Sequence, residues 1–243
     1  MSMSETGTRS DYGPMDTRYA VYFAPPPGHP LKRLADAWLG RDPDRDERVS
    51  FPIVAGIEPE RLQEITASPR HYGFHATLKA PFALAEGVEA VGLLGDVEAF
   101  AATRRPFKIR LKVDSLAGFL ALVPAEPTTA ADELAAACVE EFDRFRAPPT
   151  AEELQRRAPE RLSERERQHL ERWGYPYVLD RFRFHMTLTG PLDEPERGQV
   201  KAILEHALAP VLAEPLPVDQ LALFTQTHQV APFRVVARFP FQG

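Results

Sequence analysis

Hydrophobic and polar residues alternate in two short segments of this 243-residue chain, and the two segments resemble each other. In residues 182–188 every second residue is apolar, and the residues between them are polar. Residues 74–78 show the same alternation. Because successive side chains of a strand leave opposite faces of a sheet, both segments are predicted to be strands with one apolar and one polar face. The apolar faces are expected in the core.

Elsewhere the pattern predicts further strands and several helices. Apolar residues at helical spacing, bounded by capping residues, predict helices at residues 30–39, 88–102 and 130–146 and after Pro195. Strands are predicted at residues 18–24, 107–113, 118–123, 218–225 and 233–239. Each alternating segment is therefore followed by a helix and two strands. This repeated order predicts an α+β fold with two pseudo-symmetric lobes, each an antiparallel sheet with outer helices, flanking a central cleft.

The chain is predicted to be one bilobal domain with a tail and an insertion. Residues 1–16 are polar and contain Gly and Pro, which predicts a disordered tail before a domain at residues 17–243. A charged helical segment at about residues 147–178 lies between the two halves. Helices rich in charge are usually solvated, but this segment leads into the second alternating strand. It is either a solvated face or a lid that borders the cleft.

The two segments repeat a His-x-Thr motif, with His75 and Thr77 in the first and His185 and Thr187 in the second. A lone His on a strand is usually a hydrogen-bonded structural residue, but structure alone rarely requires the same motif twice. One imidazole can accept a proton while another, its pKa raised by a nearby anion, donates one. Thr hydroxyls can donate hydrogen bonds to anionic oxygens. The pair therefore indicates general acid–base chemistry on a phosphodiester.

Further candidate residues lie beside the motifs. Lys79, Arg183 and Thr189 fall on the predicted polar faces and are expected to line the cleft. The two cations would add positive charge for a second phosphate, or they pair with surface carboxylates at the cleft rim. Tyr22, on the first strand, and Gln226, at the end of a late strand, are candidates for binding a ribose.

Composition restricts the ligands that the chain is expected to use. The one cysteine, Cys138, falls on an apolar helical stripe, and neither motif carries a carboxylate close to its His, so no metal and no cofactor are predicted. A net charge of −6 disfavours a long nucleic-acid duplex and leaves a small phosphorylated substrate. No apolar run approaches the roughly 20 residues of a membrane span, and no signal peptide is evident at the start. We expect a soluble, cytoplasmic monomer.

At these motifs the chain resembles the two-histidine (2H) phosphoesterase superfamily, and more closely its bacterial branch named for phosphonate metabolism. The resemblance rests on three strings: RYAVYFAP at residues 18–25, GFHATLKAPF at 73–82 and RFRFHMTLTGPL at 181–192. It implies that His75 and His185 are the catalytic pair and that Thr77 and Thr187 bind phosphate.

The resemblance also implies an activity. The expected reaction is metal-independent hydrolysis of a small ribose-based cyclic phosphate, such as one produced when a carbon–phosphorus bond is cleaved. Because the two motifs are nearly symmetric, they do not show which His is the base and which the acid. Two alternatives remain: an enzyme that processes RNA ends, and a non-catalytic module that binds phosphate or a nucleotide.

Overall fold

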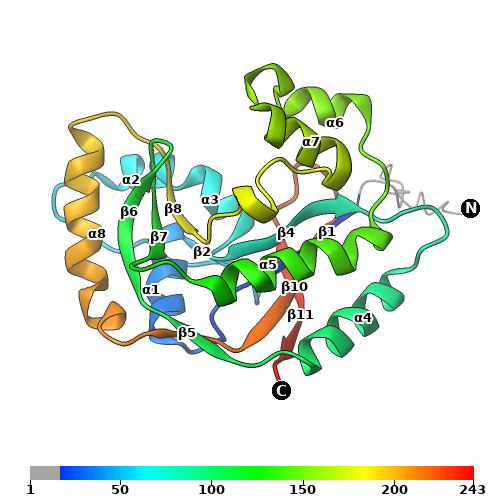
Figure 1. The fold of residues 1–243 in the computed structure, drawn as a ribbon. Helices are drawn as coiled ribbons and strands as arrows, with labels where there is room; N and C mark the ends of the chain where they lie inside the picture. Colours follow the sequence, from blue (N-terminus) through cyan, green and yellow to red (C-terminus); the bar gives the residue numbers. More distant parts are fainter. Residues whose placement is uncertain (1–16) are drawn as a thin grey trace, which may run out of the picture.

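The computed structural model describes residues 17–243, so the predicted tail lies outside the described residues. Its centre is a seven-stranded antiparallel sheet in the order β11-β10-β1-β4-β8-β7-β6 (Figure 1). These strands are β1 (Arg18–Phe23), β4 (Ala76–Ala83), β6 (Leu111–Leu116), β7 (Phe119–Pro124), β8 (Met186–Pro191), β10 (Gln220–Gln226) and β11 (Arg234–Pro240). Two small sheets pair β2 (Arg41–Asp42) with β3 (Glu47–Arg48) and β5 (Phe107–Ile109) with β9 (Leu216–Val218).

Helices pack their apolar residues against this sheet to form the main core. Helix α5 lies on β4, α4 lies near β10 and β11, and α8 runs along β6 and β7 (Figure 1). The helices are α1 (Pro30–Leu39), α2 (Pro59–Ile65), α3 (Ala67–Tyr72), α4 (Ala90–Ala102), α5 (Thr129–Glu141), α6 (Ala151–Arg156), α7 (Glu164–Trp173) and α8 (Glu196–Leu212). In residues 17–243 no helix is both long and apolar enough to cross a membrane.

Strand β1 divides its side chains between two apolar clusters, one on each face of the sheet. Val21 and Phe23 belong to the main core. Tyr22 belongs to a second, smaller cluster together with Phe224 and Phe233. Since alternate residues of a strand point to opposite faces, the second cluster marks the face opposite the main core. This second face carries the paired motifs.

Two irregularities interrupt the pairing of β4 with β1. Val21 lies opposite Lys79, but its neighbour Tyr22 lies opposite Thr77, so β4 contains an extra residue at Leu78. A second register shift occurs between Tyr19 and Val21. Such bulges reverse the face to which the following side chains point.

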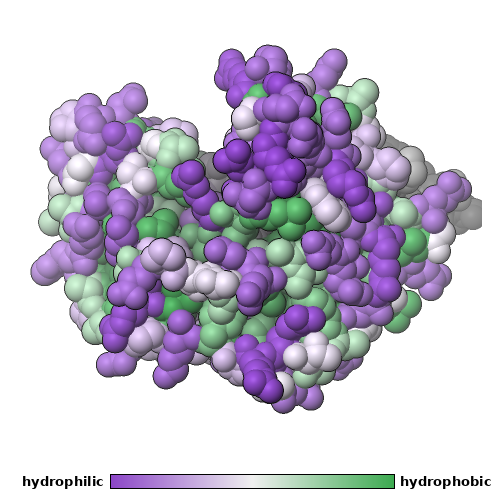
Figure 2. All heavy atoms as spheres, in the orientation of Figure 1, coloured by the Kyte–Doolittle hydropathy of each residue, from purple (hydrophilic) through white to green (hydrophobic). Residues whose placement is uncertain are grey.

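The insertion at residues 147–178 forms a separate helical lobe beside β1 and β4 (Figure 1). It contains α6, a 3₁₀ turn at Pro159–Arg161 and α7, and a second turn at Leu179–Arg181 follows it. Both α6 and α7 begin with a capping box, which in α7 is formed by Ser163 and Glu166. Its surface is strongly hydrophilic, and the molecule is hollowed between it and the part that carries α2 and α8 (Figure 2).

Comparison with the predicted elements confirms the α+β class, the antiparallel sheet and its outer helices. Helix α1 ends at Gly40, whose φ of 73° suits glycine. The predicted strand at residues 107–113 is divided into β5 and β6, and the strand at 218–225 is replaced by β9 and β10. Strands of both halves join in one sheet where β4 meets β8. The pseudo-symmetry of two lobes and the division into domains stay predictions.

Candidate active site

The two His-x-Thr motifs meet at the junction between β4 and β8. The strands pair in antiparallel register through Ala76 and Met186, the middle residues of the two motifs. In this register His75 lies opposite Thr187, and His185 lies opposite Thr77. Residues directly opposite on an antiparallel pair share a face of the sheet. The pairing therefore brings both imidazoles and both hydroxyls to one face, with the two histidines diagonal to each other.

Each imidazole is oriented by the carbonyl two residues before it. Nδ1 of His75 lies 2.9 Å from the carbonyl oxygen of Gly73, and Nδ1 of His185 lies 2.7 Å from that of Arg183. Because a carbonyl only accepts hydrogen bonds, Nδ1 carries the proton in both rings. Nε2 of each neutral ring is then a free base, or a proton donor when the ring is charged.

The two histidines differ in their surroundings. His75 stacks on Tyr22, with ring centroids 3.9 Å apart, and its Nε2 lies 3.2 Å from the hydroxyl of Thr77. Burial lowers the pKa of His75 to about 4, and the neighbouring His185 contributes in the same direction. Burial also lowers the pKa of His185, whose ring lies 5.8 Å from that of Phe119. In the ligand-free protein both rings are therefore biased toward the neutral form.

Two adjoining hollows open above these residues. His75 lines a cavity of about 270 Å³ together with Thr77 and Thr187. His185 lines a neighbouring cavity of about 530 Å³, and Thr77 borders both. Tyr175, from the end of the insertion, also borders both cavities. The insertion therefore contributes to the walls of the site, as the lid interpretation requires.

The structure does not place Lys79 in the cleft, contrary to the expectation from strict alternation. Lys79 lies opposite Val21, which faces the main core. Its ammonium donates a hydrogen bond of 2.9 Å to the carbonyl of Val139 in α5 and lies 3.3 Å from the carboxylate of Asp143. The bulge at Leu78 is the physical reason, because it reverses the face of the residues that follow.

Thr189 lines the cavity that contains His75, as expected, whereas Gln226 does not face the cavity. Thr189 is fully buried in the cleft wall, where its hydroxyl accepts a hydrogen bond from the amide of Leu120 and donates one to the carbonyl of Gly190. Thr189 lies at a register shift between β7 and β8, and its hydroxyl has no proton left to donate to a substrate. Gln226 is also fully buried and contacts Arg18 instead of facing the cavity.

Arg183 and Tyr22 do reach the site. Arg183 is exposed and lines the cavity that contains His185. Tyr22 lines the cavity that contains His75, and burial raises the pKa of its phenol well above the usual value. Whether either residue binds substrate stays a prediction.

Several cavity residues were not predicted from the sequence. Arg18 begins β1, Tyr72 ends α3, and Arg157 and Tyr175 belong to the insertion, yet all four line the cavity that contains His75. Arg18 begins the string RYAVYFAP, but nothing in that string marked it as a site residue. A signal was present only for Arg157, since the local excess of arginine in the insertion was visible in the sequence. Among residues 17–243 no cluster of three or more His, Cys, Asp or Glu side chains could hold a metal ion.

Residues 77–234 match a family model described as "Protein of unknown function (DUF1045)". Two curated relatives are each named ribose 1,5-bisphosphate phosphokinase PhnN. The protein from Janthinobacterium sp. (strain Marseille) is 40% identical over 232 residues, covering 93% of this chain and 51% of the relative. That from Laribacter hongkongensis (strain HLHK9) is 39% identical over 220 residues, covering 90% and 50%. The chain thus spans about half the length of these relatives.

Solved structures with a similar arrangement have low sequence identity. TT0787 of Thermus thermophilus is 16% identical with a TM-score of 0.45, covering 93% of this chain and 98% of that one. LigT of E. coli, in complex with ATP, is 11% identical with a TM-score of 0.44 and the same coverage.

Two His-x-Thr motifs that face one cleft from adjacent antiparallel strands form the arrangement that the resemblance to the two-histidine phosphoesterase superfamily implies. The chain belongs to the DUF1045 family, whose model matches residues 77–234. The resemblance to the branch named for phosphonate metabolism agrees with this match and with the curated relatives.

Proposed function

We propose that the chain is a cyclic phosphodiesterase that hydrolyses a small ribose-based cyclic phosphate, with His75 and His185 as general base and general acid. The observation that carries the proposal is the matched presentation of two Nε2 atoms. Each ring donates its Nδ1 proton to the carbonyl two residues before it, and the register of β4 and β8 brings the two rings to one face. General acid–base hydrolysis of a phosphodiester uses an acid and a base on opposite sides of the phosphorus atom.

The curated relatives support the ribose phosphate class. Their name describes enzymes that act on ribose 1,5-bisphosphate, and this chain matches about half of each. A cyclic phosphodiesterase that opened a ribose cyclic phosphate would produce a ribose phosphate monoester of the same class. The resemblance to the phosphonate branch points to a cyclic phosphate released by carbon–phosphorus bond cleavage.

In the proposed reaction one histidine gains a proton and the other loses one. Water attacks phosphorus while Nε2 of one neutral imidazole removes its proton, and a new P–O bond forms. The P–O bond to the ribose oxygen breaks, and this oxygen takes a proton from Nε2 of the other, charged imidazole. Thr187 donates a hydrogen bond to a non-bridging oxygen, where negative charge accumulates in the transition state, and Thr77 does the same after its hydroxyl turns away from Nε2 of His75. Solvent then restores the starting protonation of both rings.

The environments of the two rings favour His75 as the base and His185 as the acid. His75 is enclosed by Tyr22 and Thr77, and its low pKa keeps it neutral at physiological pH. His185 lines the larger cavity beside the exposed Arg183, where it can exchange protons with solvent. A bound phosphate would raise the pKa of His185 and charge it.

Turnover of 2′,3′-cyclic AMP, with and without EDTA, tests the proposal. His75→Ala and His185→Ala should each lower kcat by roughly 10²- to 10⁴-fold, and the double variant should be far from additive. His206→Ala is the matched control, because His206 is an exposed residue of α8. EDTA should leave turnover unchanged. Loss of activity on chelation, restored by zinc or manganese, would require a metal-assisted mechanism.

The same assay with RNA ends as substrate separates the proposal from the two alternatives. Faster turnover of oligonucleotide 2′,3′-cyclic ends than of cyclic mononucleotides would favour RNA processing. Binding of cyclic AMP without any turnover would favour a non-catalytic binding module.

A further inference from the structure

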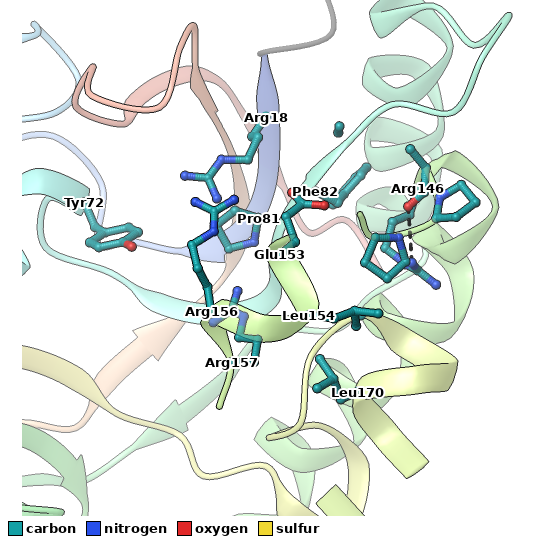
Figure 3. A pocket seen from close by; sticks show the side chains of 15 residues that line it. Arg18, Tyr72, Pro81, Phe82, Arg146, Glu153, Leu154, Arg156, Arg157 and Leu170 are labelled. Carbon is teal, nitrogen blue, oxygen red and sulfur yellow. Dashed lines mark hydrogen bonds between the residues drawn. The ribbon is translucent and has the colours of Figure 1, made fainter. Parts of the chain in front are cut away.

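Three arginines converge on a cavity that adjoins the histidine site on the side of the insertion. Arg18 comes from β1, and Arg156 and Arg157 come from the end of α6 (Figure 3). The cavity has a volume of about 260 Å³ and shares Arg18, Arg157 and Tyr72 with the cavity that contains His75. The ring of Tyr72 lies 6.1 Å from that of His75. The arginine cavity is therefore the next compartment along the same cleft.

Arg18 is held in place by a buried side chain. Both Nε and one terminal nitrogen of its guanidinium donate hydrogen bonds to Oε1 of Gln226. Gln226 is fully buried, and its amide nitrogen is fixed by the carbonyl of Ala231 at 2.7 Å and by Nε2 of His71 at 2.9 Å. The guanidinium also lies over the ring of Phe233. This arrangement orients a cation toward the cavity without neutralising it.

None of the ion pairs found in residues 17–243 includes Arg18, Arg156 or Arg157, although arginines nearby, such as Arg144 and Arg146, do pair with carboxylates. Arg157 lies over the ring of Tyr175 instead.

The nearest acid at this cavity does not neutralise the cluster. Glu153 borders the cavity, but its carboxylate accepts a hydrogen bond from the amide of Thr150 in the capping box of α6. Burial lowers the pKa of Arg18, Glu153 raises it, and Arg156 lowers it again. Three guanidinium groups that share one carboxylate, with which none of them forms an ion pair, leave an excess of positive charge that favours an anionic ligand.

We propose that this arginine cavity binds a second, non-reacting phosphate group of the substrate. The inference rests on the proposed function, because it takes the reacting phosphate to lie between His75 and His185. A five-carbon sugar would connect the two phosphates across the cavity edge near Tyr72. Arginine suits this role because its planar fork donates paired hydrogen bonds to phosphate oxygens. The substrate class is then a sugar that carries a cyclic phosphate at one end and a phosphate monoester at the other.

Two cyclic substrates that differ in one phosphate test the proposal. The pair is 2′,3′-cyclic AMP and the same nucleotide with an additional 5′-phosphate. The wild-type protein should show the higher kcat/KM with the doubly phosphorylated substrate. Arg156→Ala should raise the KM for this substrate by about tenfold to a hundredfold, as expected for loss of a charged hydrogen bond, and leave kcat nearly unchanged. Turnover of 2′,3′-cyclic AMP should stay the same.

Two matched variants exclude indirect effects. Arg161→Ala removes the same charge from an exposed position in the same insertion and should change neither KM. Arg156→Lys keeps the charge but loses the planar fork, so it should retain part of the preference. Equal kinetics of wild type and Arg156→Ala with both substrates would overturn the proposal and leave the cyclic phosphodiesterase assignment intact.

Calorimetric binding of ribose 5-phosphate to His75→Ala protein makes the test independent of turnover. Arg156→Ala in this background should weaken binding by a similar factor, and 0.5 M salt should weaken it further. If ribose 5-phosphate binds with this dependence but no cyclic phosphate is hydrolysed, the phosphate subsite stands and the proposed function fails. Binding that ignores Arg156 would refute the subsite, whatever the turnover.

Discussion

Replacing Gly73 by alanine should displace the imidazole of His75, which is hydrogen-bonded to the carbonyl of Gly73. Gly73 has a φ of 78° and a ψ of 175°, a combination that is essentially restricted to glycine. A Cβ atom at this position would lie 2.6 Å from Cγ of Pro43, well inside van der Waals contact. The carbonyl of Gly73 accepts the hydrogen bond that orients His75. Any movement that relieves the contact would therefore also move the acceptor of His75.

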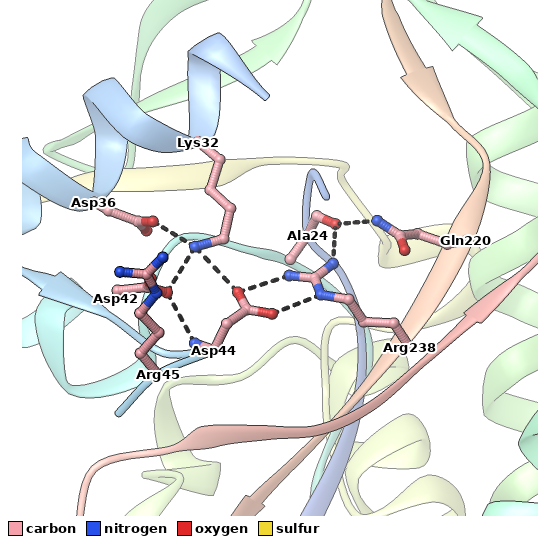
Figure 4. Close-up of polar contacts among 8 residues, drawn as sticks. All are labelled: Ala24, Lys32, Asp36, Asp42, Asp44, Arg45, Gln220 and Arg238. Carbon is pink, nitrogen blue, oxygen red and sulfur yellow. Dashed lines mark hydrogen bonds and ion pairs between the residues drawn. The ribbon is translucent and has the colours of Figure 1, made fainter. Parts of the chain in front are cut away.

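Pro43 cannot easily move away, because its turn is fixed on several sides. Its carbonyl accepts a hydrogen bond from Val235 of β11. The carboxylates that flank it, Asp42 and Asp44, both contact the buried ammonium of Lys32, and Asp44 also forms two hydrogen bonds with Arg238 (Figure 4). The turn between β2 and β3 is thereby tied to α1 and β11.

The expected loss of stability in Gly73→Ala has two contributions. The backbone conformation costs about 1–3 kcal/mol for a residue other than glycine. The contact with Pro43 adds about 1–3 kcal/mol of overpacking. For a chain of this size a loss of 1 kcal/mol lowers Tm by roughly 2–4 °C, so Gly73→Ala should lower Tm by about 4–24 °C. A displacement of His75 near 1 Å should lower kcat about a hundredfold.

Thermal unfolding and turnover of 2′,3′-cyclic AMP measure the two effects. Gly87→Ala is the matched control, because Gly87 has nearly the same φ of 77° but no neighbouring atom within 4 Å of the point where a Cβ would lie. This control should lose only about 1–2 kcal/mol and keep its kcat. If Gly73→Ala and Gly87→Ala lose the same stability and both keep full activity, the proposed route from Pro43 through Gly73 to His75 is wrong.

Three further predictions concern titration and buried charge. As a base His75 must be neutral, which holds above about pH 4, and as an acid His185 must be charged, which holds only below its lowered pKa. The ratio kcat/KM should therefore fall as the pH rises through the pKa of His185, and a rise over this range would contradict a charged imidazole as the acid. Lys32→Met leaves converging carboxylates unpaired and should lower the free energy of unfolding, measured in urea, by about 3–5 kcal/mol. Lys112→Met breaks an exposed ion pair and should lower it by only about 0–1 kcal/mol. Lys79→Met should cost about 1–3 kcal/mol and leave KM unchanged, because Lys79 bonds a buried carbonyl; a raised KM at full stability would return this residue to the cleft.

The common face of the His and Thr within each motif could be predicted from the sequence, because it depends on local alternation. His75 and Thr77 share a face in any regular strand, and so do His185 and Thr187. Tyr22 was a candidate for ribose binding only from its position on the first strand, whose face alternation did not assign, and the structure stacks it on His75. Helix ends were also local matters, as the stop at Gly40 illustrates.

Strict alternation failed where the strand is irregular. Lys79 is only two residues beyond Thr77, yet the bulge at Leu78 directs it to the opposite face. A bulge depends on how β4 pairs with β1, and the two strands are far apart in the sequence. Thr189 does line the His75 cavity, but its hydroxyl bonds the interrupted ladder with β7 and not a ligand, which local alternation does not predict.

The sequence by itself determined the chemistry of the paired motifs: two imidazoles and two hydroxyls, each set on the polar face of a strand. Only the tertiary structure decided what surrounds them. Arg18 and Gln226 are 208 residues apart and become partners because β1 and β10 are neighbours in the sheet. The arginine cavity likewise requires the insertion to fold back over β1. Local periodicity reports which face a side chain takes, whereas contacts between distant strands depend on packing that no local pattern records.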